Sequence, residues 1–100
     1  MSSNTFRKQW IAALRSGKYQ QCHSVLDTGK ACCAFGVACR LMADKLKVCI
    51  NTSGLVAYDY SVRNPPIAVI DALGLKEYGY IMEANDTGFT FEEIANLVEQ

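Results

Sequence analysis

Five cysteines and a single histidine are the residues of this 100-residue chain with the most distinctive chemistry. The thiols are at positions 22, 32, 33, 39 and 49, and they form no CxxC pair. An odd count without such pairs predicts neither a disulfide framework nor a zinc ribbon. The nearest ligand set, Cys22-His23 with Cys32-Cys33, is unfavourable because adjacent residues of a strand point to opposite faces. We therefore expect no metal and no cofactor.

Cys33 is the cysteine for which the sequence keeps a chemical role open. On a helix it falls on the same edge as Arg40 and Asp44, and a neighbouring cation lowers the pKa of a thiol. His23 is the candidate base for such a thiolate. The favoured alternative is an inert core cysteine, because no Asp or Asn is recognisable as the group that orients His23. We expect a protein that is not an enzyme, with Cys33 and Arg40 as candidate binding residues.

Two further pairs of residues are candidates for binding. Asn85 and Asp86 offer side-chain oxygens to a cation or polar ligand, and Gly88 allows close backbone approach. The favoured alternative is that they close a turn between two helices. Tyr58 and Tyr60 are candidates for a partner surface, because aromatic residues concentrate binding energy at interfaces, or else they are half-buried sheet residues.

The charge and hydropathy patterns argue against two classes of partner. Ten basic and ten acidic residues give a formal net charge of zero, so the positive field of a nucleic-acid-binding protein is missing. The apolar runs are shorter than the roughly 18 to 20 residues that span a bilayer, and the start MSSNTFRKQW lacks the apolar region of a signal peptide. We expect a cytoplasmic protein with reduced thiols and with neither nucleic acid nor membrane as partner.

The run from Ala31 to Leu46 is predicted to be the central helix. Five of its apolar residues share one narrow stripe at helical spacing, namely Cys32, Phe35, Cys39, Met42 and Leu46, and Val37 and Leu41 form a second apolar sector. Gly36 costs this helix roughly 1 kcal/mol relative to alanine, which favours close packing of another backbone element there.

Other helices are predicted from caps and apolar stripes. They run from Thr5 to Ser16, ended by Gly17; from the cap Asn64 to Leu73, ended by Gly74; from Tyr80 to Ala84; and from the capping box of Thr90 and Glu93 onwards.

Two hairpins are predicted between these helices. The first joins the segment from Tyr19 to Leu26 to a return strand near Ala31 through Asp27-Thr28-Gly29-Lys30. The second joins Val48 to Ile50 with Leu55 to Val62, placing Val56, Tyr58, Tyr60 and Val62 on one face. We predict a single α+β domain over residues 1–100, in which a small antiparallel sheet of one or two hairpins packs against three or four helices, with the helix from Ala31 to Leu46 at the centre.

Four motifs resemble a family of small uncharacterised proteins from phages, prophages and bacteria. They are W-x-x-A-L-R-S-G-x-Y-x-Q (Trp10 to Gln21), C-x-x-G-V-x-C (Cys33 to Cys39), L-G-L (Leu73 to Leu75) and N-D-x-G-x-T-F-x-x-I-A (Asn85 to Ala95). Members of that family often carry two adjacent cysteines where this chain has Cys33 and Ala34, so an obligatory thiol pair is not expected. The resemblance implies a phage or bacterial accessory protein and brings no established reaction.

We expect a non-catalytic accessory protein that binds a host protein. The alternative is a module that binds or sequesters a small molecule or nucleotide, and a thiol- or metal-dependent enzyme comes third. A homodimer formed by strand addition is a further alternative, provided that the second hairpin has an open edge.

Overall fold

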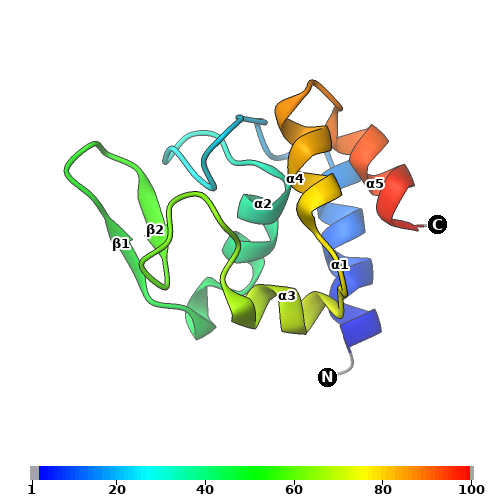
Figure 1. The fold of residues 1–100 in the computed structure, drawn as a ribbon, viewed down its shortest axis with the longest axis horizontal. Coiled ribbons are helices and arrows are strands. Elements are labelled where there is room, and N and C mark those ends of the chain that lie inside the picture. The colour runs from blue at the N-terminus through cyan, green and yellow to red at the C-terminus, as the bar shows by residue number, and fades with distance from the viewer. Residues whose placement is uncertain (1–2, 100) are drawn as a thin grey trace.

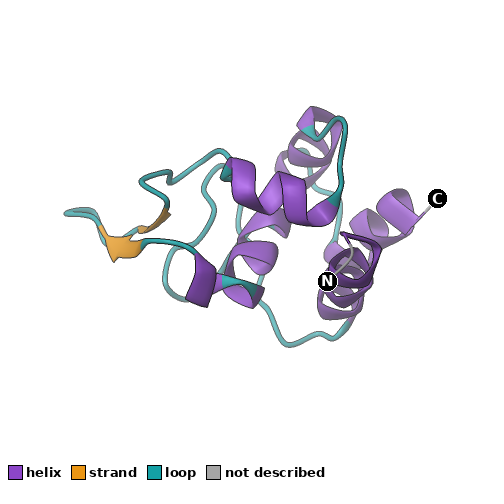
Figure 2. Cartoon of the chain, turned by 90° about the horizontal axis from the view of Figure 1, so that it is seen from below, coloured by secondary structure: helices purple, strands orange, loops and turns teal. Residues whose placement is uncertain are grey.

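The β1–β2 hairpin projects from one side of a body of helices, as Figure 1 shows and as the view from below in Figure 2 confirms. The computed structural model describes residues 3–99; residues 1–2 and 100 of the predicted domain lie outside this range. The elements in chain order are α1 (Ser3–Arg15), α2 (Ala34–Leu41), the 3-10 helix η1 (Ala43–Lys45), β1 (Val48–Ile50), β2 (Val56–Tyr58), α3 (Ile67–Leu73), α4 (Gly79–Asp86) and α5 (Phe91–Glu99). The predicted α+β class is confirmed, but the described part has five α-helices where three or four were predicted.

Helix α1 contributes the predicted apolar stripe to the core. Phe6, Trp10 and Leu14 are buried, and the Trp10 ring stacks on Phe35 of α2 with ring centroids 5.6 Å apart. The indole Nε1 of Trp10 donates a 2.8 Å hydrogen bond to the carbonyl of Ala34, so the polar end of this buried side chain is also satisfied. Helix α1 also packs against α3 and α5.

Helix α2 is shorter than the helix predicted from Ala31 to Leu46. It begins after Cys33, whose backbone is extended, and η1 follows it as a separate turn. The reason lies in the loop before it: the Cys32 N–H donates to the carbonyl of Gln20, and the Cys33 N–H donates to that of Leu26. These bonds hold both residues outside the helix. The central position is confirmed, because every residue from Ala34 to Cys39 is buried.

Gly36 lies where the loop crosses α2. A methyl group on this residue would overlap the carbonyl oxygen of Leu26 and the side chain of Cys32. The predicted close approach of another backbone element is therefore confirmed, and that element is the loop before α2.

The first predicted hairpin forms only as its turn, in which the Thr28 N–H donates to the carbonyl of Ala31. The two predicted strands are wrong, because the flanking segments make only single bridges, Gln21 to Cys32 and Asp27 to Cys32. No return strand forms because the loop pairs elsewhere: the Leu26 N–H donates to the carbonyl of Val62, far along the chain.

The second hairpin is confirmed, with a shorter second strand. Its register pairs Val48 with Tyr58, Cys49 with Ala57 and Ile50 with Val56. Strand β2 ends at Tyr58 because Asp59 and Tyr60 have positive φ angles of 52° and 69°. The prediction that Tyr58 and Tyr60 share one face is wrong for this reason: Tyr58 is buried and Tyr60 is exposed.

Helix α3 begins at Ile67, with Pro66 rather than Asn64 at the cap position. Pro65 precedes a proline and is held out of the helical conformation, which delays the helix start. Its predicted end is confirmed: Gly74 is left-handed with φ of 67°, and the Leu75 N–H donates to the carbonyl of Ile70 in a Schellman pattern.

Helix α4 is longer than predicted, and helix α5 begins with the predicted cap. Helix α4 includes Asn85 and Asp86, which were expected in the turn that follows it. The capping box of α5 is present, because the Thr90 N–H donates to Oε1 of Glu93 and the Glu93 N–H donates to Oγ1 of Thr90.

Candidate functional site

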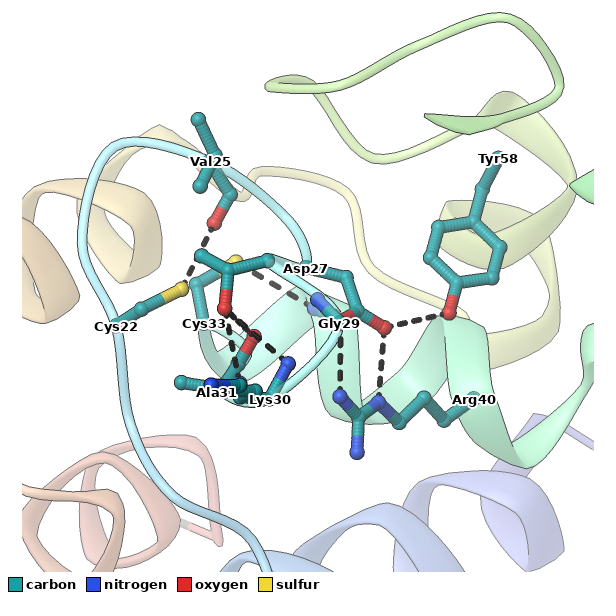
Figure 3. Close-up of polar contacts among 11 residues, drawn as sticks. Cys22, Val25, Asp27, Gly29, Lys30, Ala31, Cys33, Arg40 and Tyr58 are labelled. Atoms are coloured by element: carbon teal, nitrogen blue, oxygen red, sulfur yellow. Dashed lines mark hydrogen bonds and ion pairs between the residues drawn. The ribbon is translucent and has the colours of Figure 1, made fainter. Parts of the chain in front are cut away.

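An ion pair with a buried carboxylate joins the loop before α2 to α2 itself, and no local pattern in the sequence indicates it. Arg40 donates from Nε and from Nη2 to the two carboxylate oxygens of Asp27, both at 2.8 Å (Figure 3). Tyr58 of β2 donates its hydroxyl to the same carboxylate at 2.7 Å, and the Gly29 N–H adds a fourth bond. Asp27 is only 2% exposed, so one carboxylate holds three parts of the fold together.

The charges of this cluster are fixed at neutral pH. Burial acts to raise the pKa of Asp27, but the hydrogen bonds from Arg40, Tyr58 and the Gly29 N–H outweigh it and hold that pKa below its ordinary value. The hydrogen bond to Asp27 raises the pKa of Arg40, while burial and then the bond to Asp27 raise the pKa of Tyr58. Carboxylate, guanidinium and neutral phenol therefore coexist as a satisfied structural cluster.

Cys33 and Arg40, the pair for which the sequence left a chemical role open, have separate partners. Arg40 binds Asp27 and not Asp44, and Cys33 caps α2 by accepting from the Gly36 N–H. Burial raises the pKa of Cys33 to about 11, although the N–H groups of Gly36 and Phe35 oppose this. The lowered pKa that the sequence left open for Cys33 is therefore not found, and the buried thiol agrees with the favoured interpretation of an inert core cysteine.

The other thiols in and beside α2 belong to the core, as expected. Burial raises the pKa of Cys32 to about 12 and raises that of Cys39 as well. Cys33 borders a cavity of about 20 Å³, which is room for about one water molecule. Cys49, on β1, is exposed.

Asn85 and Asp86 organise a distant loop and do not simply close a turn. The Asn85 side chain is 2% exposed; its Oδ1 accepts from Nε2 of Gln21 and from the Ala34 N–H, and its Nδ2 donates to the carbonyl of Cys22. Asp86 accepts from the Ser24 N–H at 2.9 Å. Both residues anchor the loop of residues 20–24 to α4.

His23, the candidate base, belongs to the same anchor. Its Nδ1 lies 2.6 Å from the carbonyl oxygen of Asn85, and because a carbonyl only accepts, Nδ1 is the donor. This bond sets the orientation of the ring by the backbone of α4.

The hairpin carries an exposed apolar surface that includes Tyr60 but not Tyr58. Val48 and Ile50 of β1 are exposed, Ile50 to 72%, and Tyr60 is 75% exposed beside Lys47, whose Nζ donates to its hydroxyl. We call Val48, Cys49, Ile50 and Tyr60 the hairpin surface.

The backbone of β1 has an open edge at this surface. The Lys47 carbonyl accepts from the Asp59 N–H, and the Asn51 N–H donates to the Leu55 carbonyl, so these positions face β2. In an antiparallel ladder, successive residues direct their N–H and C=O groups alternately towards and away from the partner strand. The groups of Val48 and Ile50 therefore point away from β2. Within residues 3–99 no backbone partner meets them there.

Residues 3–99 contain neither a cluster of metal-ligating side chains nor a helix that could span a membrane. No group of three or more His, Cys, Asp or Glu side chains there is arranged to hold a metal ion. None of the helices in residues 3–99 has the length and apolar character needed to cross a membrane.

Comparison with known proteins places the site within a family. Residues 1–62 match the family model described as "Domain of unknown function (DUF8296)". The matched part includes Asp27, Arg40 and Tyr58 as well as both strands of the hairpin. No curated protein matches the chain significantly, and no solved structure does so either.

Proposed function

The chain belongs to the DUF8296 family of domains of unknown function, and we propose that it is a non-catalytic accessory protein that binds a host protein through the hairpin surface. The observation that carries this function is the open edge of β1 beside the exposed side chains of Val48, Ile50 and Tyr60. The resemblance to phage and prophage proteins supports a phage-encoded origin, and free thiols suit the cytoplasm.

The chemistry of the hairpin surface favours a protein partner. A strand edge offers main-chain donors and acceptors in a fixed row, and an extended segment of another protein can satisfy them by β-strand addition. The apolar side chains of Val48 and Ile50 then supply contacts next to these hydrogen bonds. Nucleic acid would find no comparable match, because the chain carries no net positive charge.

The hairpin is held firmly on the body of helices, which lowers the entropic cost of binding. The Val56 N–H donates to the carbonyl of Asp27, and the Tyr58 hydroxyl donates to the carboxylate of the same residue. Arg40 in turn fixes that carboxylate to α2. The buried ion-pair cluster therefore supports binding by presenting the edge, without touching the partner.

The thiols and cavities give less support to the other two functions. An enzyme that uses Cys33 would need a thiolate, and burial raises the pKa of this thiol to about 11. The cavity beside Cys33, at about 20 Å³, is far smaller than the roughly 300 Å³ of a small-molecule site. A second hollow of about 490 Å³, bordered by Arg7, Lys76 and Tyr80, is large enough, but it lies open to solvent and would bury little of a ligand.

Site-specific photo-cross-linking in host lysate tests this function. A benzophenone amino acid is placed at Ile50 in one variant and at Ile67 in the control, which is 80% exposed but lies on α3. We expect one host protein to be captured from position 50 only. That protein is then purified, and its affinity is measured for the unmodified chain, Ile50→Lys and Ile67→Lys.

The expected result is a loss of affinity of at least about tenfold for Ile50→Lys with little change for Ile67→Lys. Equal capture from both positions, or a captured protein that binds Ile50→Lys as well as it binds the unmodified chain, would refute the role of the hairpin surface.

A further inference from the structure

We propose that a second copy of this chain pairs with the open edge of β1, giving a two-fold symmetric dimer with a continuous four-stranded antiparallel sheet. The dimer would cover the hairpin surface, so only the monomer would be free to bind another protein. The dimer itself is independent of the proposed function, whereas this regulatory consequence rests on it.

In one register, the backbone of β1 can pair with β1 of the second copy. Val48 and Ile50 direct their N–H and C=O groups outwards, and Cys49 directs its own towards Ala57 of β2. If Cys49 lies opposite Cys49 of the second copy, then Val48 lies opposite Ile50 and Ile50 opposite Val48. Both of these pairs are then hydrogen-bonded pairs, and every outward group of the strand finds a partner.

The side chains are compatible with the same register. Val48 and Ile50 are on the same side of the strand, and each would contact the other residue type across the dimer axis. Lys47 would lie opposite Asn51 of the second copy, so no like charges face each other. The exposed apolar side chains of β1 thus pair with apolar ones.

The dimer closes and does not grow into a fibre. The outer edge of β2 is already occupied, because the Val56 N–H donates to Asp27 and the Tyr58 N–H donates to Ser61. Each copy therefore offers one open edge, and one two-fold pairing uses both.

The small size of the interface limits the stability of the dimer. A stable interface buries about 800 Å² on each partner, and a three-residue strand with its few exposed side chains offers less. We therefore expect a reversible dimer with a dissociation constant on the order of 0.1 mM.

Sedimentation equilibrium of the purified chain under reducing conditions tests the dimer. Concentrations from about 10 μM to 2 mM bracket the expected constant. We expect a monomer–dimer equilibrium that Ile50→Lys weakens at least about tenfold, because a lysine on an edge strand opposes pairing. Ile67→Lys, on α3, should leave it unchanged. A monomer at every concentration overturns the dimer, and so does a dimer that both variants affect equally.

Cys49 reports the register in a second experiment. In the proposed register its Cα atoms are about 4.5 Å apart, within the roughly 4.4–6.8 Å that a disulfide spans. Treatment with diamide, which accepts the two electrons and two protons of the thiols, should link Cys49 to Cys49. Ile50→Lys should reduce the yield at equal protein concentration, and Ile67→Lys should not.

A predominant linkage through Cys22, or equal yields of the Cys49 link in both variants, would contradict the register. Neither experiment contains host protein, so a chain that stays monomeric while position 50 still captures a partner refutes the dimer alone. A dimer without any captured partner would instead refute the proposed function alone.

Discussion

Asp27 and Arg40 form an ion pair with two 2.8 Å hydrogen bonds in which the two charges are unequally exposed. The carboxylate side chain is 3% exposed, whereas 30% of the Arg40 side chain reaches the surface. Loss of the partner would therefore destabilise the buried carboxylate more than it would destabilise the partly exposed guanidinium.

Arg40→Ala should destabilise the fold by about 3 kcal/mol, because it leaves the Asp27 charge buried without its partner. Arg40→Lys should cost about half as much, since a lysine keeps the charge but loses the two-pronged geometry. Chemical denaturation at pH 7 measures both. Arg15→Ala is the control: Arg15 pairs with Glu99 on the surface, and its removal should matter much less. Equal losses for Arg40→Ala and Arg15→Ala would contradict this account.

The pH dependence of stability should report the same carboxylate. Its pKa in the folded chain is below the ordinary value of 3.8, so its contribution is fully present above that value. The contribution is lost as the pH falls below 3.8 through the lower folded pKa. The difference in free energy of unfolding between the unmodified chain and Asp27→Asn should therefore be constant from pH 7 to about 5 and shrink below about 4. A difference that stays constant to pH 2 would show that Asp27 is not the group responsible.

The turn at Asp27 could be predicted from the sequence, but the ion-pair cluster that contains Asp27 could not. Asp27 follows a short apolar segment and precedes Thr28-Gly29, a composition that indicates a turn, and the turn is present. Its burial depends on Arg40 and on Tyr58, which lies 31 residues away. Apolar periodicity, helix caps and turn residues are local patterns and do not identify such distant partners. These partners meet only when the elements that carry them pack together.

The contrast between local and distant hydrogen bonds also explains the outcomes for Asn85 and for the first predicted hairpin. The C-terminal cap of α3 and the N-terminal cap of α5 were predictable because their hydrogen bonds join residues within one or two turns of each other. The loop of residues 20–24 is bonded to Cys32 and is also anchored by side chains of α4, more than 60 residues away, so a strand-like composition gave the wrong element. Gly36 was an exception: its unfavourable place inside a helix indicated a close neighbour, although not which one.

Gly36→Ala should destabilise the chain by about 3 kcal/mol, at the upper end for overpacking. The new methyl group would overlap the backbone of Leu26, which cannot rotate away as a side chain can. Gly79→Ala is the matched control, because nothing lies within 4 Å of the added atom and φ is ordinary there. We expect that variant to be neutral or slightly stabilised. Thermal unfolding of the two variants checks the contrast, which fails if their midpoints shift equally.

Thiol reactivity should separate the exposed cysteine from the buried ones. Cys49 is exposed and should react first with a disulfide reagent in the native chain. Cys32, Cys33 and Cys39 are buried, and burial raises the pKa of each, so they should react only on unfolding. Peptide mapping after a short pulse identifies the modified residues. Rapid native labelling of Cys33 would contradict its assignment as a buried helix cap.

Asn85→Ala should release the loop of residues 20–24 while leaving the helices in place. The substitution removes the acceptor of the buried Ala34 N–H and the donor to the Cys22 carbonyl, while the Gln21 amide keeps one of its two acceptors, the carbonyl of Phe89. An unpaired buried group costs about 1–3 kcal/mol, so we expect a loss near 2 kcal/mol. Asn96→Ala, an exposed change on α5, should alter the free energy of unfolding by no more than about 0.5 kcal/mol.

Hydrogen exchange provides the decisive measurement. The amides of residues 20–24 should exchange faster in Asn85→Ala, and their exchange rates should not change in Asn96→Ala. Unaltered exchange in both would mean that Asn85 does not hold the loop, and the contacts of Asp86 and His23 would then suffice.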